Sequence, residues 1–173
     1  MKNVSILSLL MILTSCVTVH PEQSPVLHPE ALPALKLPSL NPQTLSLSVL
    51  NKRAINMRAN NSSQIEGVVK DAVSQSIARG GLALSAPSKN SLMIVISDCE
   101  NIDPNLACVN ISMTLKTKDY ELEVGGKAQN GKESNGSSIP GMGDTSEAYQ
   151  TSLAMVLENL PVQVNKMDAK LHK

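Results

Sequence analysis

Aromatic side chains are nearly absent from this sequence, which has no Phe, no Trp and only Tyr120 and Tyr149 among 173 residues. Proteins that bind single-stranded nucleic acid use aromatic rings as stacking platforms for the bases, and this chain lacks such platforms. A carbohydrate site built on ring stacking is disfavoured for the same reason. The core must therefore consist of Leu, Ile, Val, Met and Ala side chains.

An excess of charge of either sign is also missing, because 15 Lys and Arg residues balance 15 Asp and Glu residues. Domains that bind nucleic acid or an anionic surface usually carry a basic patch that shows in the net charge. We therefore expect no nucleic-acid partner for this chain.

Catalytic and metal-binding combinations are scarce. The three histidines, His20, His28 and His172, lie near the ends of the chain, away from the apolar segments. A Ser–His or Cys–His nucleophile pair needs both partners on a rigid scaffold, and a zinc site needs converging ligands. The sequence thus predicts no catalytic residue, no metal and no cofactor.

Two further motifs have simple structural interpretations. The segment Gly136–Gly143 precedes a helix as a phosphate-binding loop does, but Met142 stands where that motif requires Lys. Glu121 and Glu123 alternate with apolar residues along one strand, which is typical of a solvated strand face rather than a paired-carboxylate site. We interpret the first motif as a flexible loop and the second as surface.

A long membrane-spanning run is missing too, since the apolar segment Val4–Leu13 is far shorter than the roughly 20 residues that cross a bilayer. With Lys2 before it and small residues after it, this segment predicts a secretory signal peptide over residues 1–15. The tetrad Leu13–Cys16 resembles the lipobox of bacterial lipoproteins rather than a chance cysteine after an ordinary signal peptide. The resemblance implies that Cys16 carries the lipid anchor. Val17 in place of Asp implies sorting to the outer membrane, on its periplasmic face.

Proline dominates the segment after the lipobox. Six of the ten prolines fall within residues 17–42, four or five residues apart, and no helical or strand periodicity survives between them. Such segments are extended and semi-rigid. We expect residues 16–44 to be the lipidated N-terminus and a tether, with a partner-binding polyproline ligand as the alternative.

Hydrophobic periodicity predicts regular structure from Leu45 onwards. We expect strands over 45–50, 91–98, 109–115 and 120–124, and helices over 63–79 and 146–160. Each helix has one apolar stripe, so both should cover one sheet face. The predicted fold over 45–164 is a two-layer α+β domain of order β-α-β-β-β-α, with a mainly antiparallel sheet of about four strands. We expect Pro161 to end or kink the second helix and residues 165–173 to form a flexible tail.

Cys99 and Cys108 remain once Cys16 is assigned to lipid, and they flank a short acidic segment between two predicted strands. An even count of cysteines in an oxidising periplasm favours a disulfide. Free thiols are one alternative. A calcium loop is the other, although the Asp-x-Asp/Asn-x-Asp/Asn-Gly pattern is missing.

Several stretches together resemble the YajG-type lipoproteins of Gram-negative envelopes. They are the lipobox with its Pro-rich lead, "LSLSVLNKRA", "IARGGLAL", "SLMIVISD" and "AQNGK" before the last helix. The similarity covers most of residues 45–160, although Asn51–Arg53 replaces the family's usual strand-ending Asp-Gln-Arg. It implies an envelope lipoprotein and brings no catalytic residue with it. Small lipoproteins of similar strand–helix order also serve as accessory subunits of envelope transporters and assembly machines.

The sequence therefore favours a non-enzymatic outer-membrane lipoprotein that faces the periplasm and acts by binding an envelope protein. The alternative is a ligand-binding accessory subunit of an envelope transporter or secretion machine, which predicts an apolar groove between helix and sheet. An envelope hydrolase is the least favoured class.

Overall fold

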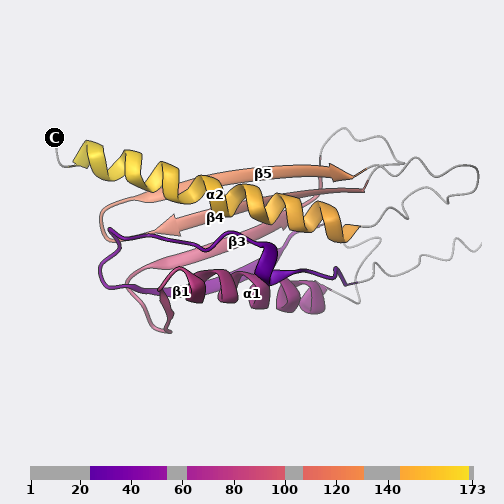
Figure 1. The fold of residues 1–173 in the computed structure, drawn as a ribbon, viewed down its shortest axis with the longest axis horizontal. Helices are drawn as coiled ribbons and strands as arrows, with labels where there is room; N and C mark the ends of the chain where they lie inside the picture. Colours follow the sequence, from indigo (N-terminus) through magenta and orange to yellow (C-terminus); the bar gives the residue numbers. More distant parts are fainter. Residues whose placement is uncertain (1–23, 54–61, 100–106, 131–144, 172–173) are drawn as a thin grey trace, which may run out of the picture.

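The computed structural model describes residues 24–53, 62–99, 107–130 and 145–171, which form one five-stranded sheet with two helices on one face (Figure 1). The sheet order is β2-β1-β3-β4-β5. In chain order the elements are η1 (Pro29–Ala31), β1 (Thr44–Asn51), α1 (Ser62–Arg79), β2 (Ala83–Leu84), β3 (Ser91–Ser97), β4 (Ala107–Lys116), β5 (Glu121–Asn130) and α2 (Thr145–Leu171). The predicted two-layer α+β fold is confirmed.

Strand directions differ from the mainly antiparallel sheet that we expected. β3, β4 and β5 form an antiparallel meander, but β1 is parallel to both of its neighbours, β2 and β3. The reason is α1, which carries the chain back along the sheet after β1. β2 and β3 therefore start at the same end of the sheet as β1 and run parallel to it. The fifth strand, β2, has only two residues, too few for a periodic signal.

β5 extends to Asn130, six residues beyond the predicted strand, and includes two glycines that suggest a loop in the sequence. At Gly126 a Cβ atom would lie 2.8 Å from the backbone oxygen of Ser152 in α2. The Ser152 hydroxyl donates a hydrogen bond to the Gly126 carbonyl oxygen at 2.5 Å. Gly126 is therefore a site where the helix backbone packs directly on the strand.

The predicted tether is wrong for residues 24–43, which we call the strap. This segment runs along the helical layer between α1 and α2 (Figure 1). Four buried leucines of the strap belong to the main core, with exposed fractions of 5% or less: Leu32, Leu35, Leu37 and Leu40. The leucines between the prolines fill the space between the two helices. Their spacing follows neither a helical nor a strand period, so the sequence pattern does not reveal that they are buried.

Backbone hydrogen bonds fix the strap to both helices. On α1, Ser76 accepts from the Leu35 amide at 3.0 Å, and the Arg79 guanidinium donates to the Leu32 carbonyl at 2.7 Å. On α2, the Gln150 side chain exchanges two hydrogen bonds with the backbone of His28, at 3.0 and 3.1 Å. A Cβ atom at position 80, just after α1, would overlap the Leu35 carbonyl, so the glycine there is required by the strap.

The predicted flexible tail is also wrong for most of its length, because α2 continues through Pro161 to Leu171. A proline inside a helix removes one hydrogen bond and costs about 3 kcal/mol. Val164, one turn beyond the proline, is only 1% exposed, so continued packing on the core offsets that cost. No helix in the described part of the chain has both the length and the apolar character needed to cross a bilayer.

Candidate functional site

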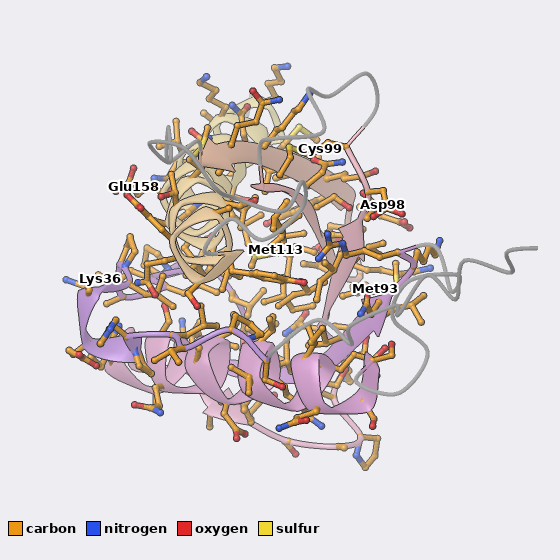
Figure 2. The ribbon with its side chains drawn as sticks, turned by 90° about the vertical axis from the view of Figure 1, so that its right-hand side faces the viewer. Lys36, Met93, Asp98, Cys99, Met113 and Glu158 are labelled. Carbon is orange, nitrogen blue, oxygen red and sulfur yellow. A yellow bond between two sulfur atoms is a disulfide. The ribbon has the colours of Figure 1, made fainter. Side chains whose placement is uncertain are left out.

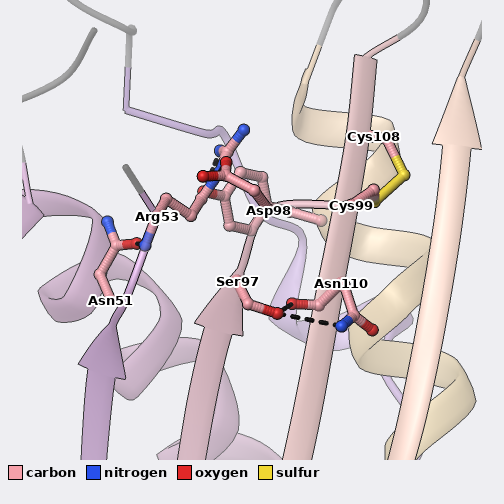
Figure 3. A network of polar contacts seen from close by, with 8 residues as sticks. Asn51, Arg53, Ser97, Asp98, Cys99, Cys108 and Asn110 are labelled. Atoms are coloured by element: carbon pink, nitrogen blue, oxygen red, sulfur yellow. Dashed lines mark hydrogen bonds and ion pairs between the residues drawn. A yellow bond between two sulfur atoms is a disulfide. The ribbon is translucent and has the colours of Figure 1, made fainter. Parts of the chain in front are cut away.

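The predicted disulfide is confirmed. Cys99, just after β3, is bonded to Cys108 in β4; their Cα atoms are 6.0 Å apart and their sequence separation is nine. Closing a loop of this length stabilises a fold by about 2.5 kcal/mol in the chain-entropy model. The bridge joins the end of β3 to the start of β4 at one end of the sheet (Figure 3).

Other predicted sites fall partly outside the described residues. Cys16, the predicted lipidation site, and the glycine-rich segment 136–143 both lie outside them. His28 is described: its side chain is 65% exposed and lies 3.3 Å from the Glu30 carboxylate. Glu121 and Glu123 are exposed on β5, as their alternation predicts.

A buried arginine that the sequence did not single out lies at the same end of the sheet as the disulfide (Figure 3). The Arg53 side chain, just after β1, is 4% exposed, and its Nε donates to an Asp98 carboxylate oxygen at 3.2 Å. Its Nη1 donates to the Tyr149 hydroxyl at 2.9 Å, and the guanidinium carbon lies 5.8 Å from the Tyr149 ring centroid. We call Arg53, Asp98 and Tyr149 the arginine cluster.

The arginine cluster joins three segments that are distant in sequence: the end of β1, the end of β3 and the first turns of α2. Asn51 also accepts a hydrogen bond from the Arg53 backbone amide at 3.2 Å. Tyr149 is fully buried, whereas the Asp98 side chain is 44% exposed. Because Nε, Nη1 and the backbone amide of Arg53 all donate to groups within the protein, we assign the cluster a role in positioning the strand ends.

The second candidate is the sheet face opposite the helices, which we call the open face. In the described part of the chain, no helix or strand packs on it (Figure 2). Strand register places the following residues there: Ser46, Ser48, Leu50, Ser91, Met93, Val95, Ser97, Asn110, Ser112, Thr114, Lys116, Glu121, Glu123, Gly125, Lys127 and Gln129. Their alternation with buried residues such as Leu92 and Ile94 sets the two sides of the sheet apart.

An apolar centre stands out on the open face. Leu50 and Met93 are 43% and 41% exposed, and Val95 is half-buried directly opposite Leu50 in the β1–β3 register. Figure 2 shows Met93 on the side of the sheet away from the helices and Met113 on the core side. Ser and Thr side chains surround the apolar centre, and charged side chains of β5 lie at the far edge.

Comparison with known proteins identifies no family. No protein-family model and no curated protein matches the chain. One solved structure, titled as an uncharacterized protein, aligns over 82% of this chain and 99% of its own, with 8% identity and a TM-score of 0.47. Protein XCC0632 from Xanthomonas campestris, of the family DUF330, aligns over 87% and 98%, with 11% identity and a TM-score of 0.38. These alignments assign no function, and the resemblance to YajG-type lipoproteins stays a prediction.

Proposed function

We propose that this protein is a non-enzymatic lipoprotein of the bacterial outer membrane, anchored through Cys16 on the periplasmic side, that binds an envelope protein through the open face. The observation that carries the binding role is the exposed apolar centre formed by Leu50, Met93 and Val95. Protein interfaces combine such an apolar centre with a polar rim, here supplied by Ser and Thr side chains.

The strap changes the geometry expected for the anchor. Because Ser24 already belongs to the described part of the domain, at most residues 17–23 separate it from Cys16. Even fully extended, this stretch spans at most about 30 Å. The Val26 amide donates to the Ser146 hydroxyl at 3.0 Å, so the strap enters at the first turn of α2. A lipid on Cys16 would therefore hold this end of the domain, which also carries the disulfide, near the membrane.

The alternative role as a ligand-binding accessory subunit predicted an apolar groove between helix and sheet. In this structure the helical layer contains the four buried strap leucines in addition to α1 and α2. The main core is thus filled by the chain itself, which favours a binding role on the surface of the domain.

Replacing Cys16 should test the anchor. We expect Cys16→Ala to leave the precursor unprocessed and to prevent labelling of the protein with a radioactive fatty acid in living bacteria. Cys99→Ala is the matched control, because it removes a cysteine without touching the lipobox and should leave both processing and labelling intact. Normal maturation of Cys16→Ala would contradict the lipoprotein assignment.

Photo-crosslinking in cells should test the open face. A benzophenone amino acid at position 93 should give a discrete crosslinked band with a partner protein, because Met93 lies in the apolar centre. The same amino acid at position 158 is the control, since Glu158 is exposed on the helical side of the domain (Figure 2). Equal crosslinking from both positions, or none from position 93, would contradict the proposal.

A further inference from the structure

β5 is the last strand of the sheet, and in the described part of the chain no other strand pairs with its outer edge. It is ten residues long, pairs with β4 in one continuous register without a bulge, and contains no proline. Bulges, prolines and short strands are common devices that keep a sheet edge from pairing with another chain. β5 has none of these three devices.

The opposite edge of the sheet is better protected. β2 pairs with the start of β1, at Thr44 and Leu45. Near the end of β1, the Asn51 amide donates to the Glu66 carboxylate of α1 at 2.8 Å, so a donor that a further strand would need is already in use. Of the two sheet edges in the described residues, β5 therefore presents the longer unpaired one.

The strand register shows which residues of β5 turn their backbone groups to the outer edge. In the β4–β5 turn, the Thr117 amide donates to the Tyr120 carbonyl oxygen at 2.9 Å, so these two residues form a hydrogen-bonded pair. Hydrogen-bonded and non-hydrogen-bonded pairs alternate along an antiparallel ladder. The residues whose amide and carbonyl groups point away from β4 are all exposed, and they are Glu121, Glu123, Gly125, Lys127 and Gln129.

The charges on this edge complement those of a second copy of β5. In an antiparallel pair centred on Gly125, Glu123 of each copy lies directly opposite Lys127 of the other. Neither side chain has an ion-pair partner in the described part of the chain. Opposite charges at directly opposed positions stabilise an antiparallel pair, and like charges destabilise it. The charged residues of this edge therefore favour pairing with a second copy.

α2 leaves room for the second copy and adds an apolar contact. Because α2 packs on β4 and β5, its axis lies about half a strand spacing inside β5, and the symmetry axis would lie about as far outside it. The two α2 helices would then be about 10 Å apart, which is the spacing of packed helices. Met155, beside Gly126, is 39% exposed, and Val162, about two turns further along α2, is 49% exposed. These apolar side chains would gain a partner in the second helix.

We propose that this chain forms a two-fold symmetric dimer in which two copies of β5 pair antiparallel, centred on Gly125, so that the two sheets become one. Such an interface uses the same surface of both copies and closes, which leaves no open β5 edge. The dimer depends on neither the lipid anchor nor the apolar centre of the open face, so each of these proposals can fail without the others.

The dimer would also determine how the domain faces a membrane. Its two-fold axis is perpendicular to the sheet, so both helical layers lie on one side and both open faces on the other. The strap runs in the helical layer (Figure 1), so both anchors would start from that side, at opposite ends of the dimer. Both open faces would then point away from the membrane, where a partner protein can reach them.

Self-association is measured by sedimentation equilibrium of the chain as purified from cells, in a density-matched detergent. We expect the wild type to dimerise. Glu123→Lys and Lys127→Glu each replace two opposite-charge pairs by two like-charge pairs and should weaken dimerisation at least about tenfold. Combining both substitutions makes the charges opposite again and should restore the dimer. Asp71→Lys, at an exposed position on α1, is the charge control and should dimerise as the wild type does.

Three outcomes of this experiment would overturn the proposal. The first is a monomeric wild type. The second is a double variant that dimerises no better than the single variants. The third is an Asp71→Lys chain that loses as much affinity as Glu123→Lys.

A cysteine at the symmetry axis tests the register. Directly opposed residues of a hydrogen-bonded pair have Cα atoms about 5.5 Å apart, within the range that a disulfide spans. Gly125→Cys should therefore form a covalent dimer under mild oxidation, seen on non-reducing gels and mapped by mass spectrometry. Glu121→Cys is the matched control on the same edge, because the two copies of position 121 would lie about 27 Å apart. Efficient covalent dimers from Glu121→Cys, or none from Gly125→Cys, would overturn the proposal.

Discussion

Leu35→Ala should lower the free energy of unfolding by about 3 kcal/mol, within the range of roughly 2–5 kcal/mol found for buried leucines. Leu35 is completely buried, and its own amide and the Leu32 carbonyl before it are hydrogen-bonded to α1, so the site cannot collapse freely around the lost volume. Leu37 is 2% exposed, and the double variant should lose about twice as much. Because whole domains are stable by only about 5–15 kcal/mol, this double variant should be close to unfolding. Urea denaturation followed by far-ultraviolet circular dichroism measures both values.

Val26→Ala is the control for the strap, since Val26 lies in the same segment but is 67% exposed. Its unfolding free energy should change by less than about 0.5 kcal/mol. A tether would tolerate all three substitutions equally. Leu35→Ala and Val26→Ala with the same denaturation midpoint would therefore contradict the assignment of residues 24–43 to the domain.

The strap also shows why part of the fold could not be predicted from the sequence. The predicted helices and long strands rest on apolar periodicity, and α1, β3 and β4 lie where that periodicity places them. Leu32, Leu35, Leu37 and Leu40 follow no helical or strand period, because an extended Pro-rich segment buries whichever side chains the neighbouring helices leave room for. Burial of this kind depends on the tertiary structure and leaves no local signal.

Glycine accounts for the other large difference between the predicted and the observed fold, the length of β5. Gly125 and Gly126 suggest the end of a strand by composition, yet β5 continues through both. The close packing of Ser152 on Gly126 explains why a glycine stands at position 126. That contact joins residues 26 positions apart in the sequence. A glycine in a strand can therefore indicate a close approach of another element as well as a turn.

Of the candidate sites too, one could be predicted from the sequence and another could not. The disulfide could be predicted, because the resemblance of Leu13–Cys16 to a lipobox implies an oxidising compartment and the cysteine count then favours pairing. The arginine cluster could not, since Arg53 looks like a strand-ending surface residue and Tyr149 like one member of an apolar helix stripe. Only the packing of α2 across the sheet brings the Tyr149 hydroxyl to 2.9 Å from the guanidinium.

Arg53→Met should cost about 2–4 kcal/mol of unfolding free energy, although Met has a similar length and an apolar side chain suits a buried site. The substitution removes donors from the Tyr149 hydroxyl, which is fully buried, and from Asp98, which solvent can still reach. Breaking a fully buried charge pair costs about 3–5 kcal/mol, and the exposure of Asp98 reduces that figure. Lys52→Met is the matched control at the exposed neighbouring position and should change stability by less than about 0.5 kcal/mol.

The contributions of the two Arg53 contacts can be separated by changing one partner at a time. Asp98→Asn keeps an acceptor for Arg53 Nε in a half-exposed position, so we expect a loss of about 1 kcal/mol or less. Tyr149→Phe keeps the ring but leaves Arg53 Nη1 without its acceptor in a buried site, and should cost about 1–3 kcal/mol. Arg53→Lys retains the charge but lacks the planar geometry that reaches both partners, so its unfolding free energy should fall between those of the wild type and Arg53→Met.

If Arg53→Met were no more destabilised than Lys52→Met in chemical denaturation, the cluster would have no role in joining β1, β3 and α2. If Asp98→Asn cost more than Tyr149→Phe, the ion pair rather than the buried hydroxyl would be the contact that holds these three segments together.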